Sequence, residues 1–413
     1  MAPDAPSRPG ADEPLVALRA LWTAVVASNP FQRRKLGADS PPPASLDAFR
    51  RDTPFTTKAE LVADQAAHPP YGTNLTEPLA LYTRCHQTSG TQGAPLRWLD
   101  TPASWSAMTE DWASVFRHAG VGPGDRILFA FSFGPFLGFW LAFEAGQRLG
   151  ALCLAGGGMT SELRGRVLVE NACTVLCCTP TYAFHLAESL AASQPGIRSS
   201  VRLIVVAGEP GGSIPAVRQH LSAAWNGARI FDHHGMTEVG PVTHEDPAHP
   251  GNLVVLESSF LAEVVDPATG MPLPEEAEGE LVLTTLRRTA SPLIRYRTGD
   301  FVRTRRVDGG LCLEGGILGR TDDMVIVRGV NVYPGAIEGL VRAQPGAGEF
   351  RVHLDTRGHL PELSIELEGT DAVATALAEA LKAALAMRIP VVAVPPGTLP
   401  RHELKARRWV RRS

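Results

Sequence analysis

The sequence lacks several features that would mark it for a particular class of protein. It has no excess of one charge, since 39 Lys and Arg residues face 43 Asp and Glu residues for a formal net charge of −4. A balanced chain creates no global field that attracts nucleic acid or an anionic bilayer, so neither is an expected partner. It also lacks a long apolar run: residues 127–143 carry no charge but fall short of the ~20 residues that cross a membrane.

Cysteine is scarce, and its spacing disfavours two further classes. The six cysteines lie in apolar segments, without the paired C-x-x-C spacing of a metal or redox site. They are predicted to be buried free thiols.

The first 13 residues are rich in Pro, Ala and Asp and lack the apolar core of a secretory signal. We therefore expect a disordered tail over 1–13 and a cytoplasmic protein.

The chain does contain a regular alternation of apolar runs and helical patterns. Strands are predicted at 127–132, 151–154, 174–178, 201–207 and 229–232, and helices at 136–149, 162–172, 182–192 and 214–225. This alternation predicts an α/β fold, with doubly wound parallel sheet and helices on both faces. Gly-rich loops follow several of these strands, at the edge where such sheets bind ligands.

After about residue 251 the pattern changes to strands without intervening helices. These are predicted at 253–256, 261–265, 280–284, 293–296 and 300–303, and form a β-rich module over about 251–310. The last segment mixes strands (324–327, 350–354, 363–368) with helices (334–341, 371–387). We expect a large N-terminal domain over 14–320 that includes the β-rich module, and a small C-terminal α+β domain over 321–413.

One loop has the composition of a phosphate-binding segment. From Thr88 it reads Thr-Ser-Gly-Thr-Gln-Gly, so that hydroxyl residues alternate with glycines. Such a loop can wrap backbone N–H groups and hydroxyls around phosphates, although it is not the G-x-x-x-x-G-K-[ST] loop of other nucleotide-binding proteins. Taken alone, a loop of this kind is more often a solvated turn.

Four further motifs follow the loop in order and change that interpretation. They are Asp232-His233-His234-Gly235-Met236-Thr237-Glu238, Tyr296-Arg297-Thr298-Gly299-Asp300, Gly319-Arg320-Thr321-Asp322-Asp323-Met324 and Leu399-Pro400-Arg401-His402-Glu403-Leu404-Lys405. With these motifs, from about Asn29 to the C-terminus, the chain resembles the adenylate-forming superfamily of acyl-CoA synthetases, luciferases and peptide-synthetase adenylation domains. Within that superfamily it looks like the phenylacetate-CoA ligase branch.

The resemblance implies an ATP site, and its residues are Thr88, Ser89, Gly90, Thr91 and Gly93 for the β- and γ-phosphates, Gly208, Glu209 and Pro210 beside the adenine, then Asp232, His233, His234, Gly235, Met236, Asp300 and Arg320. His234 occupies the place where relatives stack a Tyr on the base. Asp300 would accept hydrogen bonds from the ribose hydroxyls, with Arg320 beside it. In isolation, these residues would be interpreted as a strand end and a surface salt bridge.

Three residues would carry the catalysis that the resemblance implies. Thr237 would contact the α-phosphate and Glu238 would help hold Mg²⁺, a hard cation that prefers oxygen ligands. Lys405 would offset the negative charge that concentrates between acid and nucleotide in the transition state. Without the motif around it, Lys405 would be one more solvated lysine in a basic tail. The small domain would be mobile and would pivot at the hinge residue Asp322.

The acid pocket implied by the same resemblance consists of Phe131, Phe133, Gly134, Pro135, Phe136 and Ala207, together with the residues from His233 to Met236. These residues are apolar, aromatic or small, which suits a flat aromatic or compact apolar acid, although any core strand can have this composition. Peptide-synthetase relatives bind the substrate amine through an Asp near the start of the pocket helix. No Asp lies between Phe131 and Phe136, so an α-amino acid substrate is disfavoured.

Two positions depart from the pattern of the relatives. Ala94 stands where relatives commonly have a Lys, which removes a cation from the pyrophosphate and weakens ATP use without excluding it. Many relatives in the phenylacetate-CoA ligase branch have a Cys-x-Cys-Gly pair before the hinge, whereas only Cys312 is present here. No structural zinc is therefore expected.

The function that the sequence favours is ATP-dependent activation of an aryl- or arylalkyl-carboxylic acid as acyl-AMP, followed by transfer to a thiol. The cofactors implied are ATP, Mg²⁺ and coenzyme A, or the phosphopantetheine of a carrier protein. Two alternatives remain: a free-standing adenylation enzyme that loads an acyl carrier protein, and a non-catalytic nucleotide-binding homologue. The partner expected is a small-molecule carboxylic acid, while a carrier protein and a homodimer are left open.

Overall fold

The computed structural model describes residues 13–88, 95–307, 310–321, 323–327, 330–357, 361–401 and 408–412. The helices in these ranges are α1 (Glu13–Ser28), α2 (Pro30–Leu36), α3 (Leu46–Asp52), α4 (Lys58–Ala67), the 3₁₀ helix η1 (Leu79–Leu81), α5 (Pro102–His118), α6 (Leu137–Arg148), α7 (Ser161–Glu170), α8 (Pro180–Ser193), α9 (Pro215–Ala224), α10 (Pro334–Arg342) and α11 (Asp371–Leu385). The strands are β1 (Arg84–Gln87), β2 (Arg97–Asp100), β3 (Arg126–Phe129), β4 (Leu152–Ala155), β5 (Val175–Cys178), β6 (Leu203–Val206), β7 (Arg229–Asp232), β8 (Gly235–Met236), β9 (Gly240–Pro241), β10 (Thr243–Glu245), β11 (Leu253–Val255), β12 (Phe260–Val265), β13 (Glu278–Thr285), β14 (Tyr296–Val307), β15 (Gly310–Arg320), β16 (Val325–Val327), β17 (Val330–Val332), β18 (Phe350–Asp355), β19 (Glu362–Glu368), β20 (Val391–Val394) and β21 (Trp409–Arg412).

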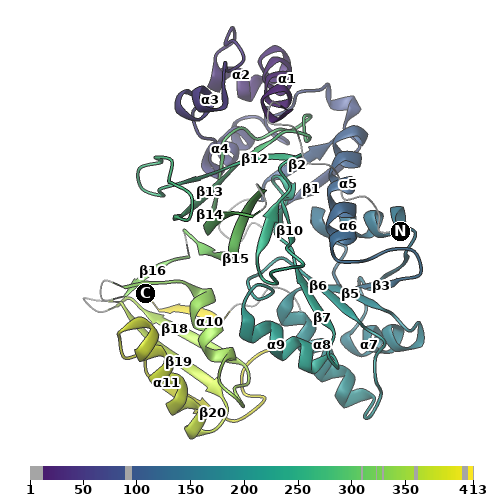
Figure 1. Ribbon diagram of the computed structural model, residues 1–413, viewed down its shortest axis with the longest axis vertical. Coiled ribbons are helices and arrows are strands. Elements are labelled where there is room, and N and C mark those ends of the chain that lie inside the picture. The colour runs from purple at the N-terminus through teal and green to yellow at the C-terminus, as the bar shows by residue number, and fades with distance from the viewer. Residues whose placement is uncertain are drawn as a thin grey trace.

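A five-stranded parallel sheet lies at the centre of the main hydrophobic core, in the order β4-β3-β5-β6-β7 (Figure 1). Strands β5 and β6 are buried along their whole length, which explains why their sequences are continuous apolar runs rather than alternating ones. From β3 the chain passes to β4 on one side, and from β4 it crosses back to β5 on the other side of β3. This reversal is the point at which open α/β sheets bind ligands, outside the carboxyl ends of the strands. The predicted α/β fold is confirmed.

The uncharged stretch 127–143 folds as predicted, into a buried strand, a turn and a helix. It forms most of β3, the turn 130–136 and the first half of α6. Within the described ranges, no helix is long and apolar enough to cross a membrane.

The cysteines are free thiols, and most of them are buried as predicted. Cys153 is only partly buried, and Cys85 is exposed. Cys85 is exposed because, on the two-stranded hairpin of β1 and β2, its neighbour His86 is the residue that faces inward. Burial raises the pKa of Cys153 and of Cys173 to about 11. These two thiols are therefore protonated and unreactive at neutral pH.

The β-rich part is a six-stranded antiparallel sheet in the order β10-β11-β15-β14-β13-β12. Four of its strands lie close to predicted ones, but the strand predicted at 293–296 is wrong. Arg295 has a φ of 45°, in the left-handed region that breaks extended pairing. The strand β14 therefore begins one residue later, at Tyr296, and brings Asp300 to the middle of the sheet.

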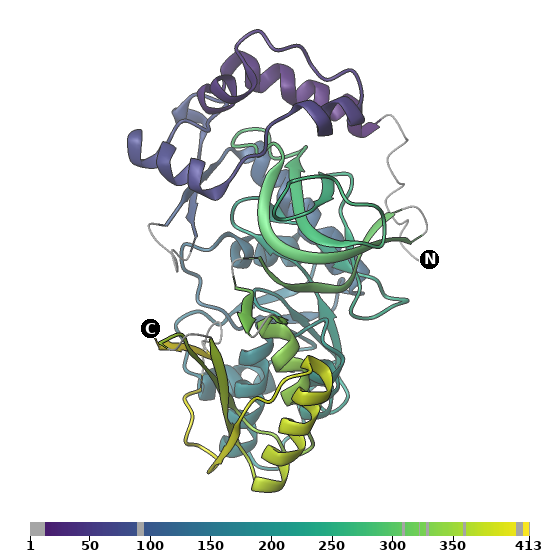
Figure 2. The ribbon, with the colours of Figure 1, turned by 90° about the vertical axis from the view of Figure 1, so that its left-hand side faces the viewer.

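The C-terminal elements from β16 to β21 have their own hydrophobic core, and we call them the C-terminal lobe. Its four-stranded sheet has the order β20-β19-β18-β21 and packs with α10 and α11. The preceding elements, α1 to β15, are called the large lobe. Figures 1 and 2 show the C-terminal lobe beside α8 and α9, at the opposite end of the molecule from α1 to α4.

The N-terminal helices are tied to the start of β14. Helices α1 and α3 share a core with Leu286 and Ile294 of the large lobe. Thr56 donates from its backbone N–H to the carbonyl of Arg295, at 2.9 Å, and from its hydroxyl to the carbonyl of Ile294, at 2.7 Å. Helix α4 begins two residues later behind a capping box on Thr57. Its first residue, Lys58, is thereby held near the antiparallel sheet.

Candidate active site

Three loops of the parallel sheet meet at its carboxyl edge, and they carry most of the predicted site. These loops follow β3, β6 and β7. The second and third are in close contact: a Cβ on Gly212 would lie 2.4 Å from Cγ of Asp232, so only glycine allows this approach. The base of the predicted phosphate loop joins the first loop, because Gln87 donates from its backbone N–H to the carbonyl of Pro135 at 2.8 Å.

Asp232 ends β7 and is held by hydrogen bonds on all sides. Its Oδ2 accepts from the Ser213 hydroxyl at 2.6 Å, and its Oδ1 accepts from the backbone N–H of His233 at 2.9 Å. Its own N–H donates to Glu245 at 2.9 Å. Burial raises the pKa of Asp232 to about 6. Because both carboxylate oxygens have protein partners, Asp232 orients the segment that follows it, and direct contact with a nucleotide stays a prediction.

The two adjacent histidines point to different surroundings, and Thr243 holds both. His233 places Nδ1 2.7 Å from the carbonyl of Thr243; a carbonyl only accepts, so Nδ1 carries the proton. Burial lowers the pKa of His233 to about 3, and its neutral ring packs on Trp112 with ring centroids 4.3 Å apart. His234 donates from its backbone N–H to the Thr243 hydroxyl at 3.0 Å and turns its ring toward Asp300.

His234, Asp300 and Arg320 come together although the sequence separates them widely. Asp300 on β14 is the register partner of Arg320 on β15, and Arg320 donates to its Oδ1 at 3.1 Å. His234 Nε2 lies 3.2 Å from Asp300 Oδ2. Both atoms are buried and lack a partner with hydrogen-bond geometry among the described residues. Buried polar atoms without partners are rare, so these two fit a site that a polar ligand completes, such as a ribose with its hydroxyls.

The guanidinium of Arg288 fixes the backbone of Thr237 and Glu238 by hydrogen bonds. Arg288 donates to the carbonyl of Thr237 at 2.8 Å and to that of Glu238 at 3.0 Å. The same guanidinium forms a bidentate ion pair with the Asp100 carboxylate, with donor–acceptor distances of 2.8 and 2.6 Å. Both partners are fully buried, so the clamp is rigid.

Sequence reasoning missed the cation that faces Glu238. Lys58 Nζ lies 3.4 Å from Glu238 Oε1, with the lysine about half exposed and the glutamate side chain buried. The protein often contributes only one or two carboxylates to a Mg²⁺ site, in which phosphates and waters supply the other oxygens. Glu238 therefore fits the predicted metal role. Nothing in the spacing of two residues so far apart could have paired Lys58 with it.

Several predicted residues lie outside the described residues: Ser89, Gly90, Thr91 and Gly93 of the phosphate loop, the hinge Asp322 and the catalytic Lys405. Thr88 is described. It is buried, it donates from its N–H to the carbonyl of Leu96 at 2.9 Å, and its hydroxyl accepts from the Leu96 N–H at 3.0 Å. This pair ties together the two ends of the predicted phosphate loop.

The predicted acid-pocket residues from Phe131 to Phe136 lie in the loop between β3 and α6, Ala207 follows β6, and the residues from His233 to Met236 follow β7. Phe131 is buried, while Phe133 packs edge-on against Trp140 and Phe143, with centroid distances of 5.1 and 5.6 Å. Trp140 also donates to the carbonyl of Gly134 at 3.1 Å. Helix α6 then packs against β8 and β9, which joins Pro135 and Phe136 to the same side of the sheet as Met236. That these residues form an acid pocket stays a prediction.

The predicted adenine edge lies between the two lobes. Gly208 has a φ of +94°, and Glu209 Oε1 accepts from the backbone N–H of Thr181 at 2.8 Å. On the other side, a Cβ built on Gly335 of α10 would lie 4.0 Å from Cβ of Pro210. The loop that follows β6 therefore contacts both α8 and the C-terminal lobe.

No three His, Cys, Asp or Glu side chains gather as a metal site in the part of the chain that the structure describes. The absence of a zinc site at Cys312 stays a prediction.

Comparison with known families and proteins places this geometry among relatives. The AMP-binding enzyme family matches residues 50–286, and the AMP-binding enzyme C-terminal domain matches residues 329–412. The chain is 31% identical, over 411 residues, to "Phenylacetate-coenzyme A ligase" of Escherichia coli (strain K12); the match covers 91% of this chain and 89% of the relative.

Solved structures of one ligase in two states resemble this chain to different degrees. 2-Hydroxyisobutyryl-CoA ligase in the postadenylation state, in complex with 2-HIB-AMP, gives a TM-score of 0.89 at 26% identity, over 99% of this chain and 95% of that one. The same ligase with 2-HIB-AMP and CoA in the thioesterification state gives 0.71 at 27% identity, over 99% and 94%. The lobes of this chain are therefore arranged more like those of the postadenylation form.

Proposed function

This chain belongs to the AMP-binding enzyme family, in its phenylacetate-CoA ligase-like branch, and on that premise we propose that its substrate is an aryl- or arylalkyl-carboxylic acid. It is an AMP-forming acid–thiol ligase. The carboxylate and ATP give acyl-AMP and pyrophosphate, and the thiol of coenzyme A then displaces AMP to give the thioester.

The observation that carries the nucleotide site is the buried group of His234, Asp300 and Arg320. Asp300 Oδ2 and His234 Nε2 are buried polar atoms without a hydrogen-bond partner among the described residues, beside a guanidinium that is already bound to Asp300 Oδ1. In our proposal the ribose hydroxyls donate to Asp300, and the imidazole of His234 stacks on or borders the base. The loop from Gly208 to Pro210 forms the opposite edge.

The charged phosphates and the metal are assigned to the other end of the site. We assign the α-phosphate to Thr237 and the metal to Glu238, whose backbone Arg288 fixes. Mg²⁺ bound there would neutralise phosphate charge. Lys405 places an ammonium where two anions approach in the first half-reaction, and preorganised charge of this kind lowers a barrier most when it costs no rearrangement. The C-terminal lobe then turns about Asp322 to admit the thiol.

The aromatic substrate class is supported by the surroundings of the acid pocket. Phe131 and Phe133 contribute aromatic rings, and Pro135 contributes a compact apolar one. Aromatic pairs contribute interaction free energy beyond that of the area they bury. His233 adds a neutral imidazole whose Nδ1 is already used, so that Nε2 is the nitrogen left as an acceptor. An acid that carries a hydroxyl or amino substituent would suit it better than a plain ring.

A carrier-protein phosphopantetheine is the alternative acceptor, because both thiols end in the same arm. A homodimer is a prediction that light scattering of the purified protein would test. We place the reaction in the cytoplasm, since free thiols such as those found here persist in a reducing compartment.

The deciding experiment is a panel of carboxylic acids assayed for pyrophosphate release, with and without coenzyme A. Release with arylalkyl acids and formation of the CoA thioester are the expected results. Release without transfer to coenzyme A would favour a carrier protein as acceptor. No release with any acid would contradict the proposal and leave the non-catalytic homologue.

A further inference from the structure

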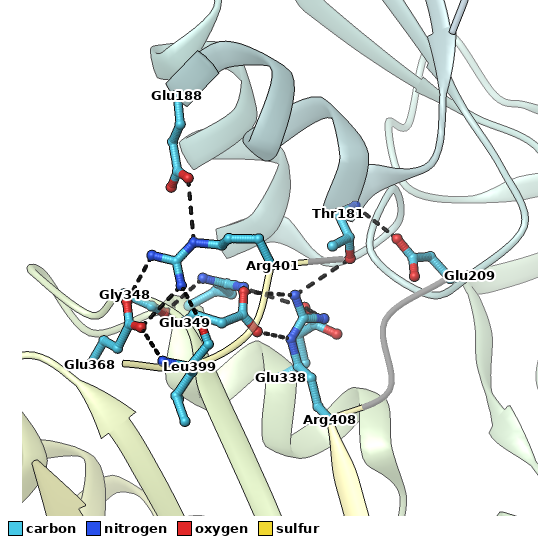
Figure 3. A network of polar contacts seen from close by, with 11 residues as sticks. Thr181, Glu188, Glu209, Glu338, Gly348, Glu349, Glu368, Leu399, Arg401 and Arg408 are labelled. Atoms are coloured by element: carbon cyan, nitrogen blue, oxygen red, sulfur yellow. Dashed lines mark hydrogen bonds and ion pairs between the residues drawn. The ribbon is translucent and has the colours of Figure 1, made fainter. Parts of the chain in front are cut away.

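A cluster of buried charges lies where the C-terminal lobe meets the large lobe (Figure 3). Arg408 donates from Nε to Glu349 Oε1 at 2.5 Å and from Nη1 to Glu338 Oε1 at 3.0 Å. Arg342 lies 3.5 Å from Glu349 through Nη2. The four side chains are between 6% and 17% exposed. We call these four residues the junction cluster.

The junction cluster contacts the large lobe at only a few points. Arg408 Nη2 donates to the Thr181 hydroxyl at 3.4 Å, and the guanidinium of Arg342 lies 5.3 Å from the ring centroid of Phe184. Both large-lobe residues belong to the first turns of α8. The N–H of Thr181 is also the donor to Glu209, in the loop assigned to the adenine, so the nucleotide site and the junction cluster meet at one helix end.

A second, weaker contact runs parallel to the first. Arg401 is held inside its own lobe by Glu368, with distances of 3.0 and 2.8 Å. Its Nε also lies 3.5 Å from Glu188 Oε2 on α8, and that glutamate side chain is 62% exposed. Such an exposed pair contributes little and weakens with salt. The pair therefore favours one orientation of the C-terminal lobe and still allows the two lobes to separate.

The charges of the junction cluster balance within the C-terminal lobe itself. If the two lobes separate, Arg408 keeps Glu338 and Glu349 and gains water, and among the described residues of the large lobe it loses the hydrogen bond to Thr181 and the electrostatic attraction of Glu209. Breaking a buried ion pair is strongly unfavourable, but this separation breaks none. The contacts across the junction therefore shift an equilibrium between two orientations instead of locking one of them.

We propose that Arg408 is a positioning residue for the first half-reaction, and that it holds the C-terminal lobe in the adenylation orientation through Thr181. The proposal rests on the proposed function, because it requires two half-reactions at one site. Arg408 lies three residues after Lys405 in the sequence. When Arg408 is anchored, the backbone of Lys405 is therefore limited to a distance of about 10 Å from that of Arg408. Release of Arg408 from α8 precedes transfer to the thiol.

The test uses large-lobe variants, because loss of Arg408 itself would leave the two buried carboxylates of Glu338 and Glu349 with Arg342 as their shared partner. Thr181→Val removes the hydroxyl and keeps the shape, and Thr181→Val with Phe184→Leu removes both contacts. We expect adenylation, measured by pyrophosphate exchange, to fall roughly tenfold in the double variant, the scale of one hydrogen bond to a charged group. Thioester formation from supplied acyl-AMP should be unchanged or faster.

A matched control is Arg351→Gln, which breaks a partly exposed pair with Glu366 within the C-terminal lobe and should leave both half-reactions unchanged. Arg408→Lys keeps the charge and should recover part of the adenylation rate that Arg408→Gln loses. A merely structural role would lower both half-reactions and the melting temperature together. Equal loss of the two half-reactions, or no loss of adenylation, would overturn the proposal.

Hydrogen–deuterium exchange of the ligand-free protein separates this proposal from the proposed function. In the double variant, peptides of α8 and α10 should exchange faster than in the parent chain, while those of α5 stay unchanged. This result would support the docking role even if no acid released pyrophosphate. Unchanged exchange in α8 and α10 would overturn it even if the ligase activity were established.

Discussion

The two sides of the candidate site are held in opposite ways. On the large-lobe side, Asp232 has hydrogen-bond partners on both carboxylate oxygens, and Arg288 clamps the backbone of Glu238 through a fully buried pair with Asp100. On the C-terminal side, the polar side-chain contacts to the large lobe among the described residues are the 3.4 Å bond of Arg408 to Thr181 and the exposed pair of Arg401 with Glu188.

This difference fits a reaction with two steps at one place. Groups that bind the nucleotide in both steps gain from rigidity, because preorganised dipoles need not rearrange as charge develops. A group that serves one step must leave before the next, so its docking has to be weak enough to reverse. The large lobe is built for the first requirement and the junction cluster for the second. The predictions below test each side, from the largest expected effect to the smallest.

The rigid side depends most on Arg288. Arg288→Gln leaves the Asp100 carboxylate buried without its partner, and breaking a pair of this kind costs about 3–5 kcal/mol of stability. We expect a large fall in the free energy of unfolding, measured by denaturant titration, and a raised KM for ATP. Arg51→Gln removes an exposed pair with Asp52 and should leave stability unchanged. A stable Arg288→Gln variant with normal KM would mean that the clamp is not what holds Glu238.

On the movable side, Lys405→Ala should nearly abolish acyl-AMP formation. Loss of one preorganised electrostatic group is worth about 2.7–4 kcal/mol in the barrier, and this lysine is assigned to the charge-concentrating step alone. Thioester formation from supplied acyl-AMP should therefore survive. Pyrophosphate exchange and single-turnover transfer would separate the two steps. Adenylation at the parent rate would disprove the role assigned to the C-terminal motif.

We assign the two histidines of the rigid side to different ligands, His234 to the nucleotide and His233 to the acid. His234 faces Asp300, so His234→Ala should raise the KM for ATP about tenfold, within the ~1–3 kcal/mol that base stacking contributes. His234→Tyr should be tolerated, because relatives use that ring. His233 packs on Trp112 instead, so His233→Ala should alter preference across the acid panel and leave the KM for ATP unchanged. A reversed pattern would exchange the two assignments.

The sequence predicts the rigid side much better than the movable one, and for a physical reason. A continuous apolar run such as the one that forms β6 indicates a buried strand or helix. Asp232 and Asp300 lie in short sequence motifs that can be recognised without a structure. The prediction failed at 293–296, where the positive φ of Arg295 depends on packing of distant segments. Contacts between single residues far apart, such as Arg408 with Thr181 or Arg288 with Asp100, leave no periodic signal, so only the fold reveals them.

The smallest expected effect concerns Lys58, which belongs to the rigid side but is itself half exposed. By the resemblance described above, Ala94 stands where relatives commonly have a Lys in the predicted phosphate loop. We propose that the Lys58 ammonium, 3.4 Å from Glu238, supplies that missing charge. A partly solvated ion contributes on the order of 1 kcal/mol or less, so Lys58→Gln should raise the KM for ATP only about threefold to fivefold. Ala94→Lys in the Lys58→Gln background should restore it, because the two cations would face the same phosphates from different elements. If Ala94→Lys restores nothing, or if Lys58→Gln lowers the melting temperature and leaves the KM for ATP unchanged, Lys58 serves only to pair with Glu238.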